Sequence, residues 1–234
     1  MNAGPRSRRE RPAKPALTRE GIIAAAVAIL RTEGLRKVTM RRLAQELDTG
    51  PASLYVYVRN TDELHAAVLD ELLGTVGPAP AGGSWRERLE RVLTDYTAML
   101  LAHPSLARSA LTARPSGPHY LRLVETLLEL LQAGGVPLAQ AAWGVDLLLQ
   151  HATATAAEHA GEEPQGDWQA AARALREAPA ATHPHIAAGA DALLSGTPEA
   201  RLSWAFRALV NGIERTAVPT PAPTDVPTEG QEAT

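Results

Sequence analysis

The sequence contains no cysteine and no long hydrophobic run, and each absence removes a class of protein. Without cysteine there is no disulfide framework, no thiol nucleophile and no thiolate metal site. No apolar run approaches the roughly 18 residues that a membrane-spanning helix needs. The basic N-terminus also lacks the apolar stretch of a signal peptide. We therefore expect a cytoplasmic protein with no membrane partner.

The signatures of catalysis are missing as well. The chain has no nucleophile elbow, no phosphate-binding loop and no metal-ligand spacing, and its Ser, His and Asp residues follow no pattern. His183 and His185 lie close together without a carboxylate or cysteine beside them, which is typical of a surface turn rather than of a metal site. We expect no enzymatic activity, no catalytic residue, no metal and no cofactor.

The net charge is small but unevenly distributed. The chain has 23 Lys and Arg and 26 Asp and Glu, which gives −3. Residues 1–60 hold 12 of the basic and 5 of the acidic residues, or +7, and residues 61–234 hold 11 and 21, or −10. Such asymmetry between two parts of a chain indicates that the N-terminal part binds a polyanion.

Helical periodicity recurs along the chain and strand alternation is nowhere convincing, so we predict an all-α fold. Thr18 is placed to cap a first helix that ends at Gly34, and Thr39 is placed to cap a second. A third begins at Gly50-Pro51, because proline at the first helical position loses no hydrogen bond. Asn60, followed three residues later by Glu63, has the form of a capping box that opens a fourth helix.

Further helices follow a linker at residues 74–83, GTVGPAPAGG. The chain breaks at His103-Pro104 and makes a short turn to Leu111. Residues 161–182 have the composition of a loose insertion with one helix. The predicted later helices span about residues 85–102, 119–133, 138–160, 168–178, 185–194 and 198–216.

The segment TMRRLAQELDTGPASLYVYVRN has the form of a helix-turn-helix, in which the second helix enters the DNA major groove. Leu54 and Val58 are four residues apart and can pack inward. Ala52, Ser53 and Val56 then share the outer face. There Ser53 can hydrogen-bond a base, and Val56 can contact a thymine methyl. We interpret the uncharged short helix as one that reads base edges while its surroundings hold phosphates. The alternative is a three-helix core with tyrosines on its surface.

Residues 18–73 resemble the DNA-binding domain of the TetR family of bacterial transcriptional repressors, above all in RRLAQELDTGPASLYVYVRN. A weaker resemblance to the C-terminal domain of the tetracycline-repressor branch extends to about residue 216, through SWRERL and HPSLARSALTARPSGPHYLRLVETLLELLQAGG. The resemblance implies a three-helix helix-turn-helix domain joined through a fourth helix to a larger helical effector-binding and dimerisation domain. The predicted ranges are a flexible basic arm at 1–16, the DNA-binding domain at 17–76, the C-terminal domain at 84–216 and a disordered tail at 217–234.

This resemblance implies a repressor that binds a palindromic double-stranded DNA operator as a homodimer and is released by a small-molecule effector of unknown identity. Two alternatives use the same helices. An activator would have the same DNA-binding domain, and a helical adaptor would bind a protein partner through it. The +7 balance of residues 1–60 and the uncharged reading face argue against the adaptor.

The residues predicted to contact DNA are Thr39, Arg41, Pro51, Ala52, Ser53, Tyr55, Val56, Tyr57, Arg59 and Thr61. By the resemblance, Tyr55 matches a phosphate-contacting tyrosine. Pro51 replaces a base-reading glutamine, and Thr61 replaces a phosphate-contacting lysine. Arg6, Arg8, Arg9 and Arg11 either add contacts to DNA or form a solvated tail.

The effector pocket is predicted from polar groups on apolar helices. Its candidate residues are Tyr96, Met99, His103, Trp143, Leu147 and His151. For Tyr96 and Met99 ordinary core positions are the favoured alternative, and for His103 the alternative is a helix cap. Ala110 stands where tetracycline repressors have a metal-ligating histidine, so we do not expect magnesium–tetracycline as the effector. Trp204 and Ala208 lie off the core stripe of the last helix and are predicted at the dimer interface.

Overall fold

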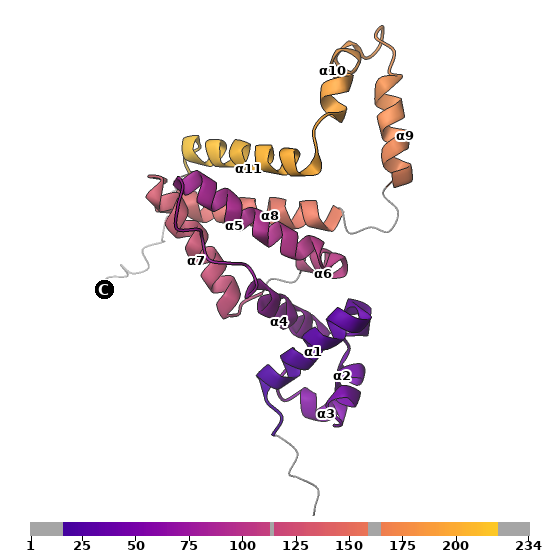
Figure 1. Cartoon of the computed structure of the whole chain (residues 1–234), viewed down its shortest axis with the longest axis vertical. Helices are drawn as coiled ribbons and strands as arrows, with labels where there is room; N and C mark the ends of the chain where they lie inside the picture. Colours follow the sequence, from indigo (N-terminus) through magenta and orange to yellow (C-terminus); the bar gives the residue numbers. More distant parts are fainter. Residues whose placement is uncertain (1–15, 113–114, 159–164, 220–234) are drawn as a thin grey trace, which may run out of the picture. The chain divides into compact units, whose positions relative to one another are not determined.

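The computed structural model describes residues 16–112, 115–158 and 165–219, and every regular element in these ranges is helical, which confirms the all-α prediction (Figure 1). The elements are α1 (Arg19–Glu33), the 3-10 turn η1 (Leu35–Lys37), α2 (Met40–Glu46), α3 (Pro51–Leu54), α4 (Thr61–Leu73), α5 (Trp85–Leu101), α6 (Pro104–Ala110), α7 (Pro118–Ala133), α8 (Leu138–Glu158), α9 (Gln165–Arg176), α10 (Pro184–Leu194) and α11 (Pro198–Arg215). None of the described helices is long and apolar enough to cross a membrane. The arginines of the predicted arm lie outside the described residues.

The described residues form two compact units. The first contains those of Met1–Gly77, Tyr96–Leu123 and Thr153–Glu162, and the second those of Pro78–Asp95, Val124–Ala152 and Glu163–Thr234. The first unit therefore combines the predicted helix-turn-helix with α6, the end of α5, the start of α7 and the end of α8. The four sequence ranges given above for the domains stay predictions.

Local signals define the helices at the N-terminal end of the first unit. The hydroxyl of Thr18 accepts a hydrogen bond from the amide of Gly21 at 3.0 Å, and that of Thr39 accepts one from Arg42 at 3.2 Å. Both residues satisfy an amide that the first helical turn leaves without a partner, as predicted. The core that these helices enclose is apolar and fully buried, and includes Ile22, Ala26, Leu43, Leu54, Val58, Leu64 and Val68.

Three details differ from the sequence prediction. Residues 104–110 form the helix α6 rather than a turn, and Leu35–Lys37 form the unpredicted η1. At the start of α4, Asn60 caps the helix by accepting from the amide of Glu63 at 2.8 Å. The carboxylate of Glu63, however, accepts from the amide of Arg59 and not from that of Asn60. The capping box is therefore present in one direction only.

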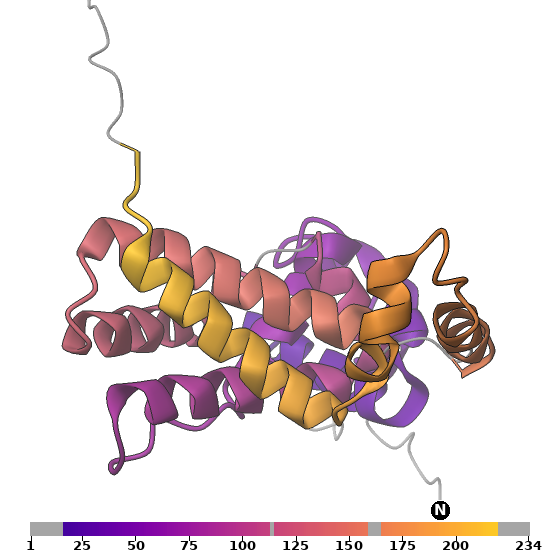
Figure 2. The same ribbon diagram turned by 90° about the horizontal axis from the view of Figure 1, so that it is seen from above.

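In the second unit, α11 runs beside α8 (Figure 2). Phe206, Val210 and Ile213 form the buried stripe of α11. The side-chain amide of Gln140 donates to the carbonyl of Ile213 at 3.0 Å. A Cβ atom at Gly144 would come within 2.9 Å of Ile213, so the glycine allows α8 and α11 to approach closely.

Candidate nucleic-acid interface and effector residues

The turn between α2 and α3 brings the two helices together without a side-chain cap. Asp48 adopts a positive φ of 47°, which Asp tolerates better than most residues. The amide of Thr49 donates to the carbonyl of Ala44 at 2.8 Å. Gly50 is extended, and Pro51 takes the first helical position, as the sequence predicted. The chain can therefore restart as a helix within a few residues.

The residues of α3 and the turn that follows it divide into an inward and an outward set, as predicted. Leu54 and Val58 are fully buried, whereas Val56 is 80% exposed and Tyr55 52% exposed. Ala52 and Ser53 are exposed too. The α-helix itself ends at Leu54, and hydrogen bonds from the amides of residues 57 and 58 to the carbonyl of Leu54 close the turn that follows. Small and apolar side chains thus face outward above the buried Leu54 and Val58, a surface suited to base edges.

Two adjacent arginines on α2 have different surroundings. The guanidinium of Arg42 bonds Glu33 of α1 at 2.6 Å and Glu46 of α2 at 2.9 Å. The hydrogen bond from Arg42 lowers the pKa of Glu33 below its ordinary value. Arg41 is exposed, and within the described residues it makes no hydrogen bond or ion pair. Arg42 therefore ties α1 to α2, and Arg41 is left available for a phosphate.

Arg59 and the start of α4 flank the exposed face of α3. The side chain of Arg59 is 87% exposed, and its Nε donates to the carboxylate of Glu63 at 3.0 Å. Bonds from the amide and then the side chain of Arg59 lower the pKa of Glu63 below its ordinary value. The guanidinium is thereby held in place but remains open to solvent.

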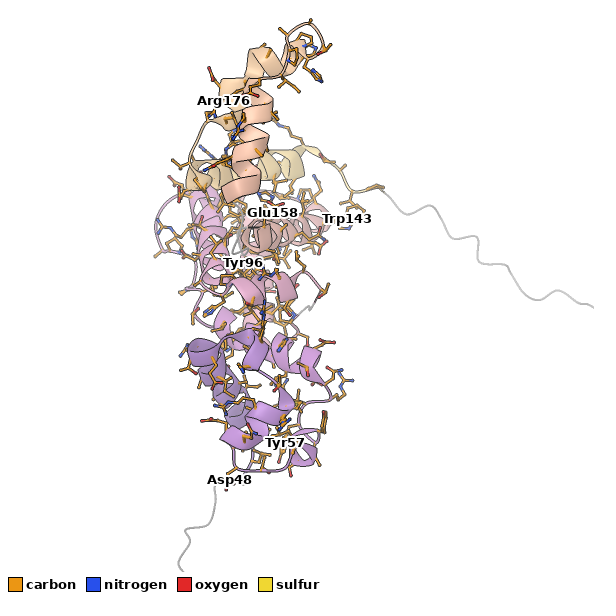
Figure 3. All side chains as sticks on the ribbon, turned by 90° about the vertical axis from the view of Figure 1, so that its right-hand side faces the viewer. Asp48, Tyr57, Tyr96, Trp143, Glu158 and Arg176 are labelled. Carbon is orange, nitrogen blue, oxygen red and sulfur yellow. The ribbon has the colours of Figure 1, made fainter. Side chains whose placement is uncertain are left out.

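The ten residues predicted to contact DNA all belong to the first unit. Figure 3 marks the position of Tyr57 in this part of the chain. Eight of the ten are exposed and two are half-buried; the exposed residues are Thr39, Arg41, Pro51, Ala52, Ser53, Tyr55, Val56 and Arg59, and the half-buried ones are Tyr57 and Thr61. Their contact with DNA stays a prediction.

The predicted effector residues on and after α5 also lie in the first unit. Tyr96 is buried, and its hydroxyl shares a hydrogen bond of 2.8 Å with that of Thr153 on α8. Burial raises the pKa of Tyr96, against the opposing effect of this hydrogen bond. Met99 is 8% exposed. His103 is half-buried, and burial, together with the charge of Arg31, lowers its pKa.

The three predicted effector residues on α8 belong to the second unit and differ among themselves. Trp143 is 62% exposed and Leu147 is 44% exposed, so neither lines an enclosed cavity within the chain. The His151 ring meets Phe206 of α11 edge-on, with centroids 5.7 Å apart. Its Nε2 atom is buried and has no hydrogen-bond partner among the described residues.

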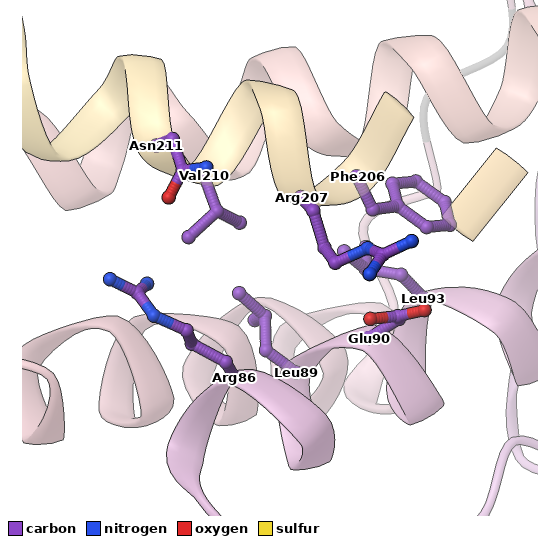
Figure 4. Close-up of a pocket in the computed structure, with 8 residues that line it drawn as sticks. All are labelled: Arg86, Leu89, Glu90, Leu93, Phe206, Arg207, Val210 and Asn211. Carbon is purple, nitrogen blue, oxygen red and sulfur yellow. The ribbon is translucent and has the colours of Figure 1, made fainter. Parts of the chain in front are cut away.

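A pocket of about 230 Å³ lies between α5 and α11 in the second unit (Figure 4). Its lining is Arg86, Leu89, Glu90, Leu93, Phe206, Arg207, Val210 and Asn211. Glu90 accepts a hydrogen bond from Ser203, and Arg86 forms an ion pair with Glu214 at 2.6 Å. None of the six predicted effector residues lines this pocket. Sequence periodicity could identify the apolar side of α5 but not its distant partner α11.

The predicted dimer residues are both on the outside of α11. Trp204 is 68% exposed, and Ala208 is exposed as well. On α8 the exposed residues Trp143, Asp146, Leu147 and Gln150 recur at helical spacing. Both α8 and α11 thus carry exposed apolar side chains, each including a tryptophan.

Comparison with known families identifies both parts of the chain. Residues 22–68 match the family described as bacterial regulatory proteins, tetR family. Residues 77–217 match the family described as tetracyclin repressor-like, C-terminal domain. The two matches together cover most of the described residues.

Relatives and solved structures give the same result. The proposed transcription regulator SCO7704 of Streptomyces coelicolor is 63% identical, with a TM-score of 0.77 over 89% of this chain and 100% of that one. The TetR family protein ActR of the same species, in complex with actinorhodin, is 36% identical, with a TM-score of 0.74 over 85% and 96%. The repressor DrrR1 of Streptomyces coeruleorubidus is 37% identical over 55% of this chain and 48% of its own. The chain spans about half the length of the curated relatives that it matches.

Proposed function

Because the chain belongs to the tetR family of bacterial regulatory proteins, we propose that it is a DNA-binding transcriptional repressor. It binds a palindromic operator as a homodimer and leaves the operator when a small molecule binds. The observation that carries this proposal is the exposed, uncharged face of Ala52, Ser53 and Val56 over the buried Leu54 and Val58. Such a face can approach base edges closely, while Arg41 supplies a charge for the phosphate backbone.

Repression is favoured over activation by the relatives. DrrR1 and the class D tetracycline repressor of Escherichia coli are both repressors. Release by a small molecule is supported by ActR, which has been solved with actinorhodin bound. In this chain the effector would prefer a conformation in which the two recognition helices of the dimer are wrongly spaced for the operator.

For the effector, Tyr96, Met99 and His103 remain the proposed contacts. They offer a buried hydroxyl, a thioether and a half-buried imidazole on neighbouring turns of the first unit. Trp143 and Leu147 are better suited to the dimer interface, together with Trp204 and Ala208, because all four are exposed. This assignment follows the general rule that large exposed apolar side chains mark contact surfaces.

The test is a selection of genomic DNA fragments by the purified protein at two salt concentrations. We expect an enriched palindrome whose half-sites are about one helical turn apart. Affinity should fall steeply as salt rises, because phosphate contacts release counterions. Binding without an enriched sequence would contradict the proposal.

A matched pair of variants sharpens this test. Arg41→Ala should weaken binding to all sequences and reduce the salt slope by about 1. Arg91→Ala removes one exposed positive charge from α5, in the second unit, and should leave the slope unchanged. Equal slopes for both variants would show that net charge, rather than a positioned arginine, drives the binding.

A further inference from the structure

A buried carboxylate joins α4 to the start of α7 within the first unit. Asp70 lies on the last turns of α4 and is only 7% exposed. Its Oδ1 accepts a hydrogen bond from the amide of Tyr120 at 2.9 Å, and its Oδ2 accepts one from the amide of His119 at 3.5 Å. Both amides belong to the first turn of α7. An acidic side chain from one helix therefore caps another helix that begins about 50 residues later.

Two glycines permit this contact. A Cβ atom on Gly117 would overlap the carboxylate of Asp70. A Cβ atom on Gly74 would come within 2.9 Å of the His119 ring. A side chain at either position would therefore displace Asp70 or His119. Because both positions are crowded, α4 and α7 cannot slide along each other without breaking the contact.

The contact is strong because the carboxylate is buried. A buried charge is costly unless it is hydrogen-bonded, and the amides at the start of a helix offer both donors and a favourable dipole. If the first turn of α7 moved away, Asp70 would be left as a buried carboxylate without these donors. Breaking the contact is therefore costly, because the carboxylate would stay buried without its donors.

The contact lies near the end of α4 that is far from α3, so a small rotation at the contact moves the start of α4 by a larger distance. Asp70 is nine residues beyond Thr61, a distance of about 14 Å along a helix. A rotation of about 10° around Asp70 would move the start of α4 by roughly 2 Å, on that helical geometry. Residues 55–60 connect this start to the end of α3. A small displacement at α7 would thus be enlarged where the proposed DNA-reading residues lie.

We propose that Asp70 is a positioning residue that couples the first turn of α7 to α4 and thereby sets the affinity of the chain for DNA. This inference rests on the proposed repressor function. With the contact made, α4 holds one orientation, as operator binding by a dimer of defined spacing requires. With the contact broken, α4 samples several orientations. DNA binding then loses affinity, because it must also overcome the conformational entropy of α4. An effector that moves the start of α7 would act on DNA affinity through this contact.

The first test uses hydrogen exchange of the full-length, DNA-free protein, at a temperature well below its unfolding midpoint. Asp70→Asn keeps the shape of the side chain and removes its charge. Gly117→Ala adds a methyl group that displaces the carboxylate of Asp70. We expect each variant to raise exchange at least tenfold in α3 and α4, besides the first turn of α7. Ser203→Ala is the control, because it removes a hydrogen bond between α11 and α5 in the second unit. An increase confined to the first turn of α7 would show that Asp70 is only a helix cap and would overturn the coupling.

The second test measures affinity for the palindrome that the wild-type protein selects. Asp70→Asn and Gly117→Ala should each weaken binding at least fivefold, and the double variant should bind no more weakly than the weaker single variant. The two losses of binding free energy should not add, because both changes break the same contact. Changes that act independently would give losses that add. Wild-type affinity in both single variants, or additive losses, would overturn the proposal. If the wild-type protein selects no palindrome, the repressor function fails instead, and the exchange experiment still decides whether α7 controls α4.

Discussion

Leu54 and Val56 are two residues apart, and their surroundings assign them different roles. Leu54 is fully buried beneath α3, and Val56 is 80% exposed on the opposite side. The first contributes to the stability of the helix-turn-helix, and the second is available to a partner. A pair of variants at these positions can therefore separate folding from recognition.

We expect Leu54→Ala to lower the free energy of unfolding by about 2–5 kcal/mol, because it leaves a cavity in the core. Val56→Ala should change that free energy by less than about 0.5 kcal/mol, since the side chain is exposed. It should nevertheless weaken binding to the selected palindrome by about 1 kcal/mol, since the contact with a thymine methyl loses two methyl groups worth about 0.8 kcal/mol each when fully buried. Urea unfolding and DNA titration measure the two quantities. A Val56→Ala protein with full affinity would remove this residue from the reading face.

His103 makes stability depend on pH. Burial, assisted by Arg31, lowers its pKa below the ordinary value of 6.5. As the pH falls below about 6.5, the unfolded chain therefore takes up a proton that the folded protein resists, and stability is lost. We expect the unfolding midpoint to drop less between pH 8 and pH 5.5 in His103→Gln than in the wild-type protein. An equal drop in both proteins would show that other groups cause the acid sensitivity.

At the scale of elements, helix starts account for both the successes and the errors of sequence-based prediction. Thr18, Thr39 and Asn60 cap α1, α2 and α4, as their sequence neighbourhoods indicate. Pro104 predicts a break after His103, but α6 begins at this residue, because proline at a first helical position also starts helices. The carboxylate of Glu63 accepts hydrogen bonds from the backbone and side chain of Arg59 instead of completing the capping box. Hydrogen bonds from the positively charged guanidinium are stronger than those from a neutral donor.

The cap of α4 is testable by itself. Asn60→Ala should lower the free energy of unfolding by about 1 kcal/mol, because the amide of Glu63 loses its acceptor. Asn60→Asp keeps an acceptor at the same place and should unfold within a few tenths of a kcal/mol of the wild-type protein. Chemical denaturation of the three proteins decides the matter. A loss of equal size in both variants would mean that the side-chain amide has another role.

At the scale of the whole molecule, the exposed aromatic side chains require an explanation. Trp143 on α8 and Trp204 on α11 are 62% and 68% exposed. Exposed apolar surface of this kind is unfavourable in water and is typical of contacts between proteins. A second copy of the chain would cover it and would place two recognition helices on one operator.

We expect the wild-type chain to sediment as a dimer and Trp204→Lys to raise the dimer dissociation constant at least tenfold, since a buried lysine would lack a partner. Trp168→Lys is the matched control, because Trp168 is 58% exposed but lies on α9. Sedimentation velocity measures association, and circular dichroism checks that the helices remain. A dimer unaffected by Trp204→Lys would exclude this part of α11 from the interface.

The sequence by itself determined what depends on neighbouring residues. Helical spacing put Leu54 and Val58 inward and Val56 outward, and capping residues placed the starts of the first helices, because these features arise within one or two turns. Only the tertiary structure decided which distant groups meet. Tyr120 donates its amide to Asp70, Arg86 pairs with Glu214, and a pocket opens between α5 and α11. The partners are tens of residues apart or more, and no local period records which helix will lie against which.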